Sequence, residues 1–429
     1  MRVTIVVPSF PKLTETFIVT KFLGLLERGW DMHVVCETTD LADWDRFPDL
    51  LRQAGTRHRV HCSWPHRPRW LALLLVPVAL FRCIFKNPIG TSQYLLNGWR
   101  LIGIDALRRL YLDANLVILK PDIIHFEFGA LAFGRKHLKE FLNCRVVVSF
   151  RGYDLNHFGV EHDRFFRDIW DQADAIHVLG EDLWRRAMRR GCPADRFHQL
   201  IPPAIDANLF NPMNRMHTDF AGTRERPLRI LSVGRLEWEK GYEYAIHAIR
   251  KLKNQGVCCS YRIVGRGSFL EAIAFAIHQF ALDDDVQLLG GLSQAQVVEE
   301  MRIADIFLHS AVSEGFCNAV LEAQAMMLPV VCSDAGGLPE NVLHTETGFV
   351  VPRRYPAALA EKLALLGSDP DMRQRMGLAG RRRVQIHFRL VDQITSFEQL
   401  YSRVMQSNAE AGGEADTYIC ATQVSLTEG

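Results

Sequence analysis

Short apolar runs alternate with segments of helical periodicity along most of the chain. In the first half, Val3–Val7 is followed by a helical Glu15–Glu27 and then by a strand-like Met32–Cys36. Similar runs follow at Ile123–Phe126, Val146–Phe150 and Ala175–Leu179. They are rich in Val and Ile and uniformly apolar, as expected of parallel strands that are covered on both faces. The alternation predicts an α/β fold with an open, doubly wound sheet.

The pattern breaks near Ile201, where Pro, Asn and other polar residues predict a linker over 206–227. A second alternation begins with Leu228–Val233. Its further strands are predicted at Ser260–Val264, Val286–Leu289, Ile306–His309 and Val330–Cys332. We therefore predict two doubly wound, Rossmann-like domains, 1–205 and 228–386, with a cleft between them for one large substrate.

The C-terminal part of the chain has a pattern of apolar and polar residues that differs from that of both domains. Apolar residues recur with helical spacing over 387–405, which predicts one long amphipathic helix. Residues 406–429 are polar and small, and we expect a disordered tail there.

Composition fits a large enzyme and argues against a nucleic-acid-binding protein. The chain has 429 residues, more than one core usually supports, and a net charge of +1. It has no basic helix interleaved with aromatic residues, so nucleic acid is not expected as a partner. The ten cysteines form no CxxC pair, no histidine cluster has metal-ligand spacing, and no signal peptide precedes Val3. We expect a cytoplasmic protein with buried thiols and no bound metal or other cofactor.

The longest apolar stretch, Trp70–Phe85, allows two interpretations. It contains Pro77 and Arg82 and is shorter than the about 20 residues of a membrane-spanning helix. It could be a core helix. It could equally lie on a membrane surface, at the inner face of the cell membrane, because Arg67, Arg69, Arg82 and Lys86 flank or interrupt the run and suit anionic headgroups.

Three strand-to-helix loops of the second half carry the candidate chemistry. The first, Val233–Gly241, places Arg235 and Lys240 at the carboxyl end of the sheet, where a diphosphate could bind. The second, His309–Asn318, contains Glu314, Gly315, Phe316 and Cys317 and leads into a helix that carries Glu322. The free N–H groups at that helix start offer an anion or hydroxyl site. The third is Ser333–Glu340, and Ile263–Gly267 with Gly265 closes a further strand without the full GxGxxG of nicotinamide-binding proteins.

The ordered motifs GRL-x-x-x-KG, IVGRG, SEGF-x-x-x-x-LEA, PVV and GGLPE resemble the second domain of family 4 glycosyltransferases, which have the GT-B fold. The resemblance covers about Leu228 to Val351. It implies that Arg235 and Lys240 bind the diphosphate of a nucleotide-sugar donor, that Glu314 lies near the transferred sugar and that Glu322 binds the ribose. It also implies metal-independent transfer with retention of configuration, and a final helix that crosses back to the first domain.

The first domain resembles the family more loosely. Pro8–Ile18 is similar to the P-K-x-[ST]-E-T-F-I opening of a subgroup that acts in exopolysaccharide or colanic-acid-type polysaccharide biosynthesis. The acceptor implied is a growing polysaccharide or a lipid-linked saccharide. Thr14, Glu15 and Thr16 are placed on the acceptor side, although the two threonines could instead cap the following helix.

Two positions depart from the family pattern at the ligand end of the first sheet. Many members have His-Gly where this chain has Arg151-Gly152, and a second His near Glu127. Arginine stays protonated and cannot act as a base, but it can stabilise negative charge. We predict an Arg151–Glu127 ion pair that lines the reaction centre, with a purely structural pair as the alternative; Asp154 of the same loop is assigned to the acceptor side.

The sequence thus predicts a glycosyltransferase that acts by electrostatic stabilisation of a departing diphosphate. Two rival functions remain open at this point. One is a nucleotide-sugar epimerase with the same fold. The other is a non-catalytic subunit that binds nucleotide sugars, which the altered Glu127 and Arg151 positions suggest.

Overall fold

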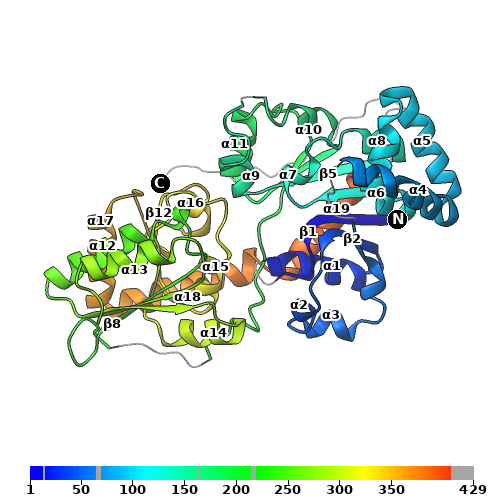
Figure 1. Cartoon of the computed structure of the whole chain (residues 1–429). Helices are drawn as coiled ribbons and strands as arrows, with labels where there is room; N and C mark the ends of the chain where they lie inside the picture. The colour runs from blue at the N-terminus through cyan, green and yellow to red at the C-terminus, as the bar shows by residue number, and fades with distance from the viewer. Residues whose placement is uncertain (13–14, 64–68, 163, 214–218, 407–429) are drawn as a thin grey trace.

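The computed structural model describes residues 1–12, 15–63, 69–162, 164–213 and 219–406 (Figure 1). Its strands form two separate sheets, and every strand pair in both sheets is parallel. Helices are packed around each sheet. Because the strands of each sheet are parallel, their carboxyl ends lie at one edge. The predicted pair of doubly wound domains is confirmed.

The first sheet has seven strands in the order β3-β2-β1-β4-β5-β6-β7. The strands are β1 (Arg2–Ser9), β2 (Asp31–Thr38), β3 (Val60–Cys62), β4 (Ile123–Phe126), β5 (Arg145–Phe150), β6 (Ala175–Val178) and β7 (His198–Leu200). The helices are α1 (Thr16–Glu27), α2 (Leu41–Trp44), α3 (Pro48–Arg52), α4 (Arg69–Lys86), α5 (Pro88–Ile102), α6 (Asp105–Leu119), α7 (Gly129–Ala132), α8 (His137–Leu142), α9 (Gly152–Asn156), α10 (Arg167–Gln172) and α11 (Glu181–Arg189).

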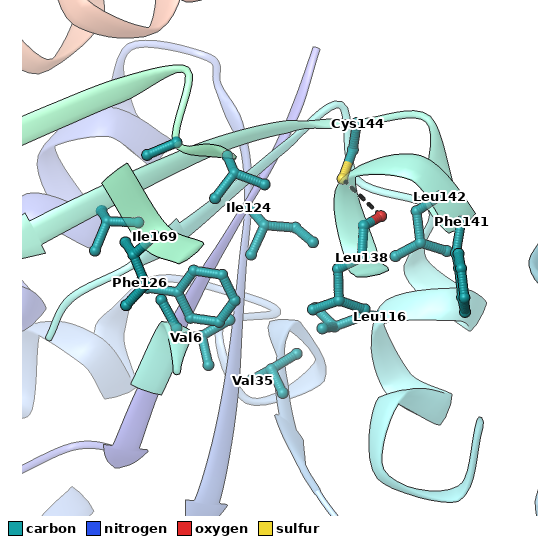
Figure 2. Packing of buried hydrophobic residues seen from close by; sticks show 14 of the residues in the cluster. Val6, Val35, Leu116, Ile124, Phe126, Leu138, Phe141, Leu142, Cys144 and Ile169 are labelled. Atoms are coloured by element: carbon teal, nitrogen blue, oxygen red, sulfur yellow. Dashed lines mark hydrogen bonds between the residues drawn. The ribbon is translucent and has the colours of Figure 1, made fainter. Parts of the chain in front are cut away.

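The core of this domain lies on both faces of the central strands. Val6 of β1 is in register with Phe126 of β4, which is in register with Val148 of β5. All three are buried, and Figure 2 shows Phe126 beside Val6 with Ile124 on the same strand. At the edge of the cluster the Cys144 thiol donates to the carbonyl oxygen of Leu138 at 3.7 Å. Burial of this apolar surface is what fixes the strand ends, and hence the site.

The second sheet has six strands in the order β10-β9-β8-β11-β12-β13. The strands are β8 (Leu228–Val233), β9 (Cys259–Val264), β10 (Val286–Gly290), β11 (Ile306–His309), β12 (Val330–Ser333) and β13 (Gly348–Val351). The helices are α12 (Tyr242–Asn254), α13 (Leu270–Gln279), α14 (Gln294–Ile303), α15 (Asn318–Ala325), α16 (Leu338–Asn341), α17 (Pro356–Ser368) and α18 (Pro370–His387).

The last helix, α19 (Leu390–Gln406), belongs to the core of the first domain. Its Phe397, Leu400 and Tyr401 are buried against a cluster that includes Val3 and Ile5 of β1. The chain therefore returns from the second domain to the first, as the resemblance implied, and α18 ends at His387 before the crossing (Figure 1). The tail predicted at 406–429 lies, beyond Gln406, outside the described residues.

Three strands were missed by the hydrophobic pattern: β3, β7 and β13. Each is an edge strand of only three or four residues. The residues of β3 and β7 are half-buried or exposed, because an edge strand is covered less completely than a central one. β3 and β7 thus lack the uniformly apolar run that marks a buried parallel strand, whereas β13 is apolar but only four residues long.

Candidate active site

The second-domain site is built on a carboxylate with two basic partners. Glu314 lies in the loop between β11 and α15, Lys240 in the loop after β8, and His309 is the last residue of β11. The Lys240 ammonium donates to the Glu314 Oε2 at 2.5 Å, and His309 Nε2 donates to the same oxygen at 3.0 Å. All three side chains are largely buried.

The pKa values of these groups keep all three charged at neutral pH. Burial opposes ionisation of Glu314, but Lys240 and His309 outweigh it and lower its pKa to about 2. Burial likewise opposes the Lys240 charge, yet Glu314 raises the Lys240 pKa above its ordinary value. The Cys317 sulfur and Glu314 overcome burial at His309 and raise its pKa to about 9. The cluster thus carries more positive than negative charge, which suits an anionic ligand.

The start of α15 adds backbone donors beside this cluster. Cys317 is the N-cap, and its amide donates to Asn341 Oδ1 at 3.0 Å, while the Gly315 amide donates to Glu314 Oε1 at 3.2 Å. Two of the predicted free amides are therefore already bonded. Among the described residues, the amides of Phe316 and Asn318 have no acceptor, so they remain available for an anion.

Arg235 and Glu322 are placed less tightly than Lys240. Arg235 is 59% exposed and pairs with Glu239 at 3.0 Å, so the predicted diphosphate role requires it to turn inward. Glu322 lies on α15, and its carboxylate has no hydrogen-bond or charge partner within the described part of the chain. Burial raises the pKa of Glu322 to about 7. A carboxyl left unpaired in such surroundings is suited to a ligand hydroxyl. Gly265 follows β9 directly, and its amide donates to the carbonyl oxygen of Gly290 at 2.8 Å.

The first-domain site contains the predicted Arg151–Glu127 ion pair. Arg151 Nη2 donates to Glu127 Oε2 at 2.9 Å, and its Nε donates to the Glu127 carbonyl oxygen at 3.2 Å. The guanidinium also lies 4.0 Å from the ring centre of Phe17, a cation–π distance. Burial lowers the pKa of Arg151 to about 10, so it is still a cation at neutral pH. The ion pair is confirmed; its part in the reaction stays a prediction.

Sequence reasoning missed Lys21, which completes this group. Lys21 lies on the buried face of α1 and donates to Glu127 Oε1. Its ammonium is also 4.4 Å from the ring centre of Phe397 on α19. Burial and the Arg151 charge lower the Lys21 pKa well below its usual value. Glu127 therefore has two basic partners, Lys21 and Arg151, and the crossing helix α19 packs against Lys21.

Backbone contacts bring the two half-sites together. A Cβ added to Gly152 would lie only 2.9 Å from the nitrogen of Gly315, so the loops that hold Arg151 and Glu314 touch. Close by, Asn156 Nδ2 donates to Ser313 Oγ at 3.0 Å. This contact brings together the loops that carry the predicted catalytic residues of both domains.

A second interdomain contact was also missed by sequence reasoning. Glu340, from the GGLPE motif, accepts hydrogen bonds from the backbone amides of Glu181 at 2.8 Å and Asp182 at 2.7 Å. These amides begin α11 in the first domain, where a helix favours negative charge. Nothing in the sequence pairs these two segments, because they are far apart along the chain.

The predicted acceptor-side residues are spread over different environments. Thr14 lies outside the described residues. Thr16 is the first residue of α1, and the N-cap is Glu15, whose side chain makes no capping hydrogen bond; the alternative that Thr16 caps the helix is wrong. Glu15 pairs with Lys12 at 2.7 Å. Asp154 is buried and accepts from the amides of Ala130 and Arg151 at 3.0 and 2.9 Å, so its placement favours a structural role.

The site also contains one set of side chains with metal-ligand chemistry. Donor atoms of His309, Glu314 and Cys317 lie within 4.8 Å of one another. The Glu314 oxygen that would bind a cation already accepts from Lys240 and His309. Two positive groups on that oxygen disfavour a further cation there.

Comparisons with known proteins agree with this arrangement. Residues 217–383 match the family described as glycosyl transferases group 1. The chain thus carries a glycosyl transferase group 1 domain, and it is a glycosyltransferase. It is 28% identical over 401 residues to the amylovoran biosynthesis glycosyltransferase AmsK of Erwinia amylovora, covering 90% of this chain and 96% of that protein. It is 27% identical over 397 residues to the putative colanic acid biosynthesis glycosyltransferase WcaL of Escherichia coli, covering 85% of this chain and 90% of WcaL.

Solved structures share the fold over nearly the whole chain. Sucrose-phosphate synthase from Thermosynechococcus elongatus aligns with a TM-score of 0.72 at 18% identity, over 95% of this chain and all of that one. Anabaena HepE in complex with UDP-glucose aligns with a TM-score of 0.69 at 17% identity, over 94% of this chain and all of HepE. These likenesses establish the GT-B fold.

Proposed function

We propose that this chain is a retaining, metal-independent glycosyltransferase that moves a sugar from a nucleotide-diphosphate donor to a saccharide or lipid-linked saccharide in polysaccharide assembly. One observation carries the proposal: the Lys240–Glu314–His309 cluster lies against the Arg151 loop across the Gly152–Gly315 contact. The names of AmsK and WcaL support the acceptor class, and the UDP-glucose bound to HepE supports the donor class.

The proposed reaction needs charge stabilisation more than covalent chemistry. The bond between the sugar C1 and the diphosphate oxygen breaks, and the acceptor hydroxyl oxygen forms a bond to C1 on the same face. The acceptor proton passes to the departing phosphate oxygen. Lys240, His309, Arg151 and the α15 amides supply positive charge where the diphosphate gains negative charge. Arg235 adds a further cation once it turns into the site.

The proposed metal independence is supported by the same charges. Lys240 and His309, both held by Glu314, would supply the positive charge that a divalent cation supplies in metal-dependent enzymes. The test is transfer from labelled nucleotide sugar to an acceptor lipid fraction in the presence of EDTA, with the anomeric configuration of the product read by NMR. Retained configuration without added metal is the expected result; inversion or a metal requirement would contradict the proposal.

We further propose that the α4–α5 hairpin rests on an anionic lipid surface. One face of α4 is in the core through Val76, Ala79 and Cys83. The opposite face of α4 is apolar and exposed, and α5 and the start of α6 also carry exposed apolar side chains; the exposed residues are Leu74, Val78, Phe81, Ile84, Phe85, Ile89, Leu96, Trp99, Leu101 and Ile104. The core interpretation of Trp70–Phe85 thus fits one face of α4, and we propose the membrane-surface interpretation for the other.

Charge and position single out lipid as the occupant of this face. Residues 50–104 contain eight Lys and Arg and no Asp or Glu, so anionic headgroups are favoured. Figure 1 shows α4 and α5 at the end of the first domain far from the second, so docking there leaves the cleft open. No helix in the described ranges is long and apolar enough to cross a bilayer. An exposed apolar helix face with basic residues around it is suited to lie in the interface, and we place it at the inner surface of the cell membrane.

Replacing Phe81, Phe85 and Trp99 together with serine should lower vesicle binding by at least about tenfold, because each loses apolar surface that the bilayer would bury. Phe85 is 81% exposed and Trp99 64% exposed, so the fold should tolerate the change. The measurement is co-sedimentation with vesicles of equal parts phosphatidylglycerol and phosphatidylcholine.

Phe275→Ser, at an exposed position on α13 of the second domain, is the matched control and should bind vesicles as the wild type does. Equal binding by wild type and triple variant would contradict the lipid assignment. So would a wild type that ignores vesicles and dimerises through this face.

A further inference from the structure

A continuous line of aromatic rings runs from Trp238 of the second domain along the first domain, and three of its rings are exposed. Its members, in spatial order, are Trp238, His157, Tyr153, Phe158, Phe165 and Phe133, and we call them the aromatic stripe. Neighbouring ring centres are 5.3, 6.0, 6.4, 5.0 and 4.5 Å apart along this order. Tyr153 is 60% exposed, Phe133 51% and Trp238 45%, so the stripe reaches the surface at these three rings. Phe158 and Phe165 are half-buried and pack against the core of the first domain.

The stripe begins at the predicted catalytic groups. Tyr153 follows Arg151 and Gly152 directly, and Trp238 lies in the loop between Arg235 and Lys240. The first ring contact, between His157 and Trp238, joins the two domains. A ligand lying along the stripe would therefore have one end at the reaction centre.

The segment that carries Tyr153, His157 and Phe158 is held in place by Arg190. The Arg190 guanidinium donates to the carbonyl oxygens of Asp154 at 3.0 Å, Phe158 at 2.8 Å and Gly159 at 2.6 Å. Gly159 has a φ of +61°, and a Cβ there would lie 2.3 Å from the Phe165 ring. These constraints order the backbone that carries Tyr153, His157 and Phe158, which reduces the entropy that this segment would lose when a ligand binds.

We infer that the aromatic stripe binds the acceptor saccharide, one sugar residue after another, and so directs its terminal hydroxyl to the reaction centre. The apolar C–H face of a pyranose packs well on an aromatic ring, and a row of rings suits a chain of sugars. A single nucleotide base would occupy one ring and leave the rest of the row unused. Exposed Glu161, His162 and Arg164 beside the rings offer partners for sugar hydroxyls. This inference rests on the proposed function.

The double variant Tyr153→Ala/Phe133→Ala tests the inference, because neither ring contacts the second domain in the ring pairs above. The acceptor is the lipid extract of cells that lack this enzyme, titrated at saturating donor. We expect the half-saturating amount of extract to rise about tenfold, with kcat and donor KM unchanged. Phe275→Ala on α13 is the control and should leave all three parameters at their wild-type values.

Each other outcome is decisive. Unchanged half-saturation in the double variant would overturn the stripe as an acceptor site while leaving the proposed function intact. A rise in donor KM instead would assign the rings to the nucleotide and also overturn the inference. A wild type that transfers no sugar to the extract would remove the proposed function and the inference together. Equal melting temperatures of variant and wild type confirm that folding is not the cause.

Discussion

Lys240→Ala should lower kcat by about 10²–10³-fold at saturating donor, the usual cost of losing one donor to developing negative charge. In the structure the Lys240 ammonium is buried beside Glu314 and the start of α15, where water cannot replace it. The loss should fall on kcat more than on donor KM, because the diphosphate gains charge in the transition state.

The control for this variant is Lys253→Ala. Lys253 lies on α12 of the same domain, pairs with Asp285 at 2.7 Å and is remote in role from the site. It should keep wild-type kcat. Full activity of Lys240→Ala at saturating donor would remove Lys240 from the mechanism, and a large fall in melting temperature would require the comparison to be repeated with Lys240→Met.

Arg151→Ala should lower kcat by about 10²-fold, and Arg151→His should recover little of it. The guanidinium is fixed by Glu127 and Phe17, and its loop touches the loop of Glu314. A histidine side chain is too short to keep these contacts. The fold should survive either change, since Glu127 keeps Lys21 as a partner.

Arg145→Ala is the matched control, because Arg145 begins the same strand that Arg151 follows and pairs with Asp174 at 3.0 Å. It stands at the opposite end of β5 from the cleft. Steady-state kinetics of Arg151→Ala, Arg151→His and Arg145→Ala test whether Arg151 takes part in the reaction. Near-normal rates in both Arg151 variants would leave the Arg151–Glu127 pair with a structural role only.

The central strands and the ligand loops could be predicted because their signals are local. A buried parallel strand needs an uninterrupted apolar run, as in Ile123–Phe126, and a ligand loop follows it directly. The Arg151–Glu127 pair could be predicted as well, since both residues follow neighbouring strands at the same edge of the sheet. Contacts that follow from the order of the strands alone could therefore be predicted from the sequence.

Contacts between distant segments could not be predicted in this way. Lys21 did leave a signal, a lone charge on the buried stripe of α1 with Ile18 and Phe22, but nothing identified Glu127 as its partner. His309 lies in the second of the predicted ligand loops. Its charge, however, depends on Glu314 and Cys317, which the fold brings next to it. The pairing of Glu340 with the start of α11 depends on how the two domains meet.

The sequence alone also could not predict which aromatic and apolar side chains are exposed. The sequence marks Trp70–Phe85 as apolar but does not say which face is covered, and only α6 and the sheet decide that Cys83 is buried and Phe81 is not. The aromatic stripe joins residues from three separate loops. Their alignment is a result of packing around Arg190 and Gly159.

Sugar transfer from a nucleotide donor is tested most directly by incubating the wild-type enzyme with radiolabelled UDP-, GDP- and ADP-sugars and the lipid extract of cells that lack it. One donor should lose its sugar to the extract, with one nucleoside diphosphate released for each sugar incorporated and EDTA without effect. A donor that changes its sugar without any extract would indicate an epimerase, and a donor that binds without release would indicate a non-catalytic subunit; either result would contradict the account.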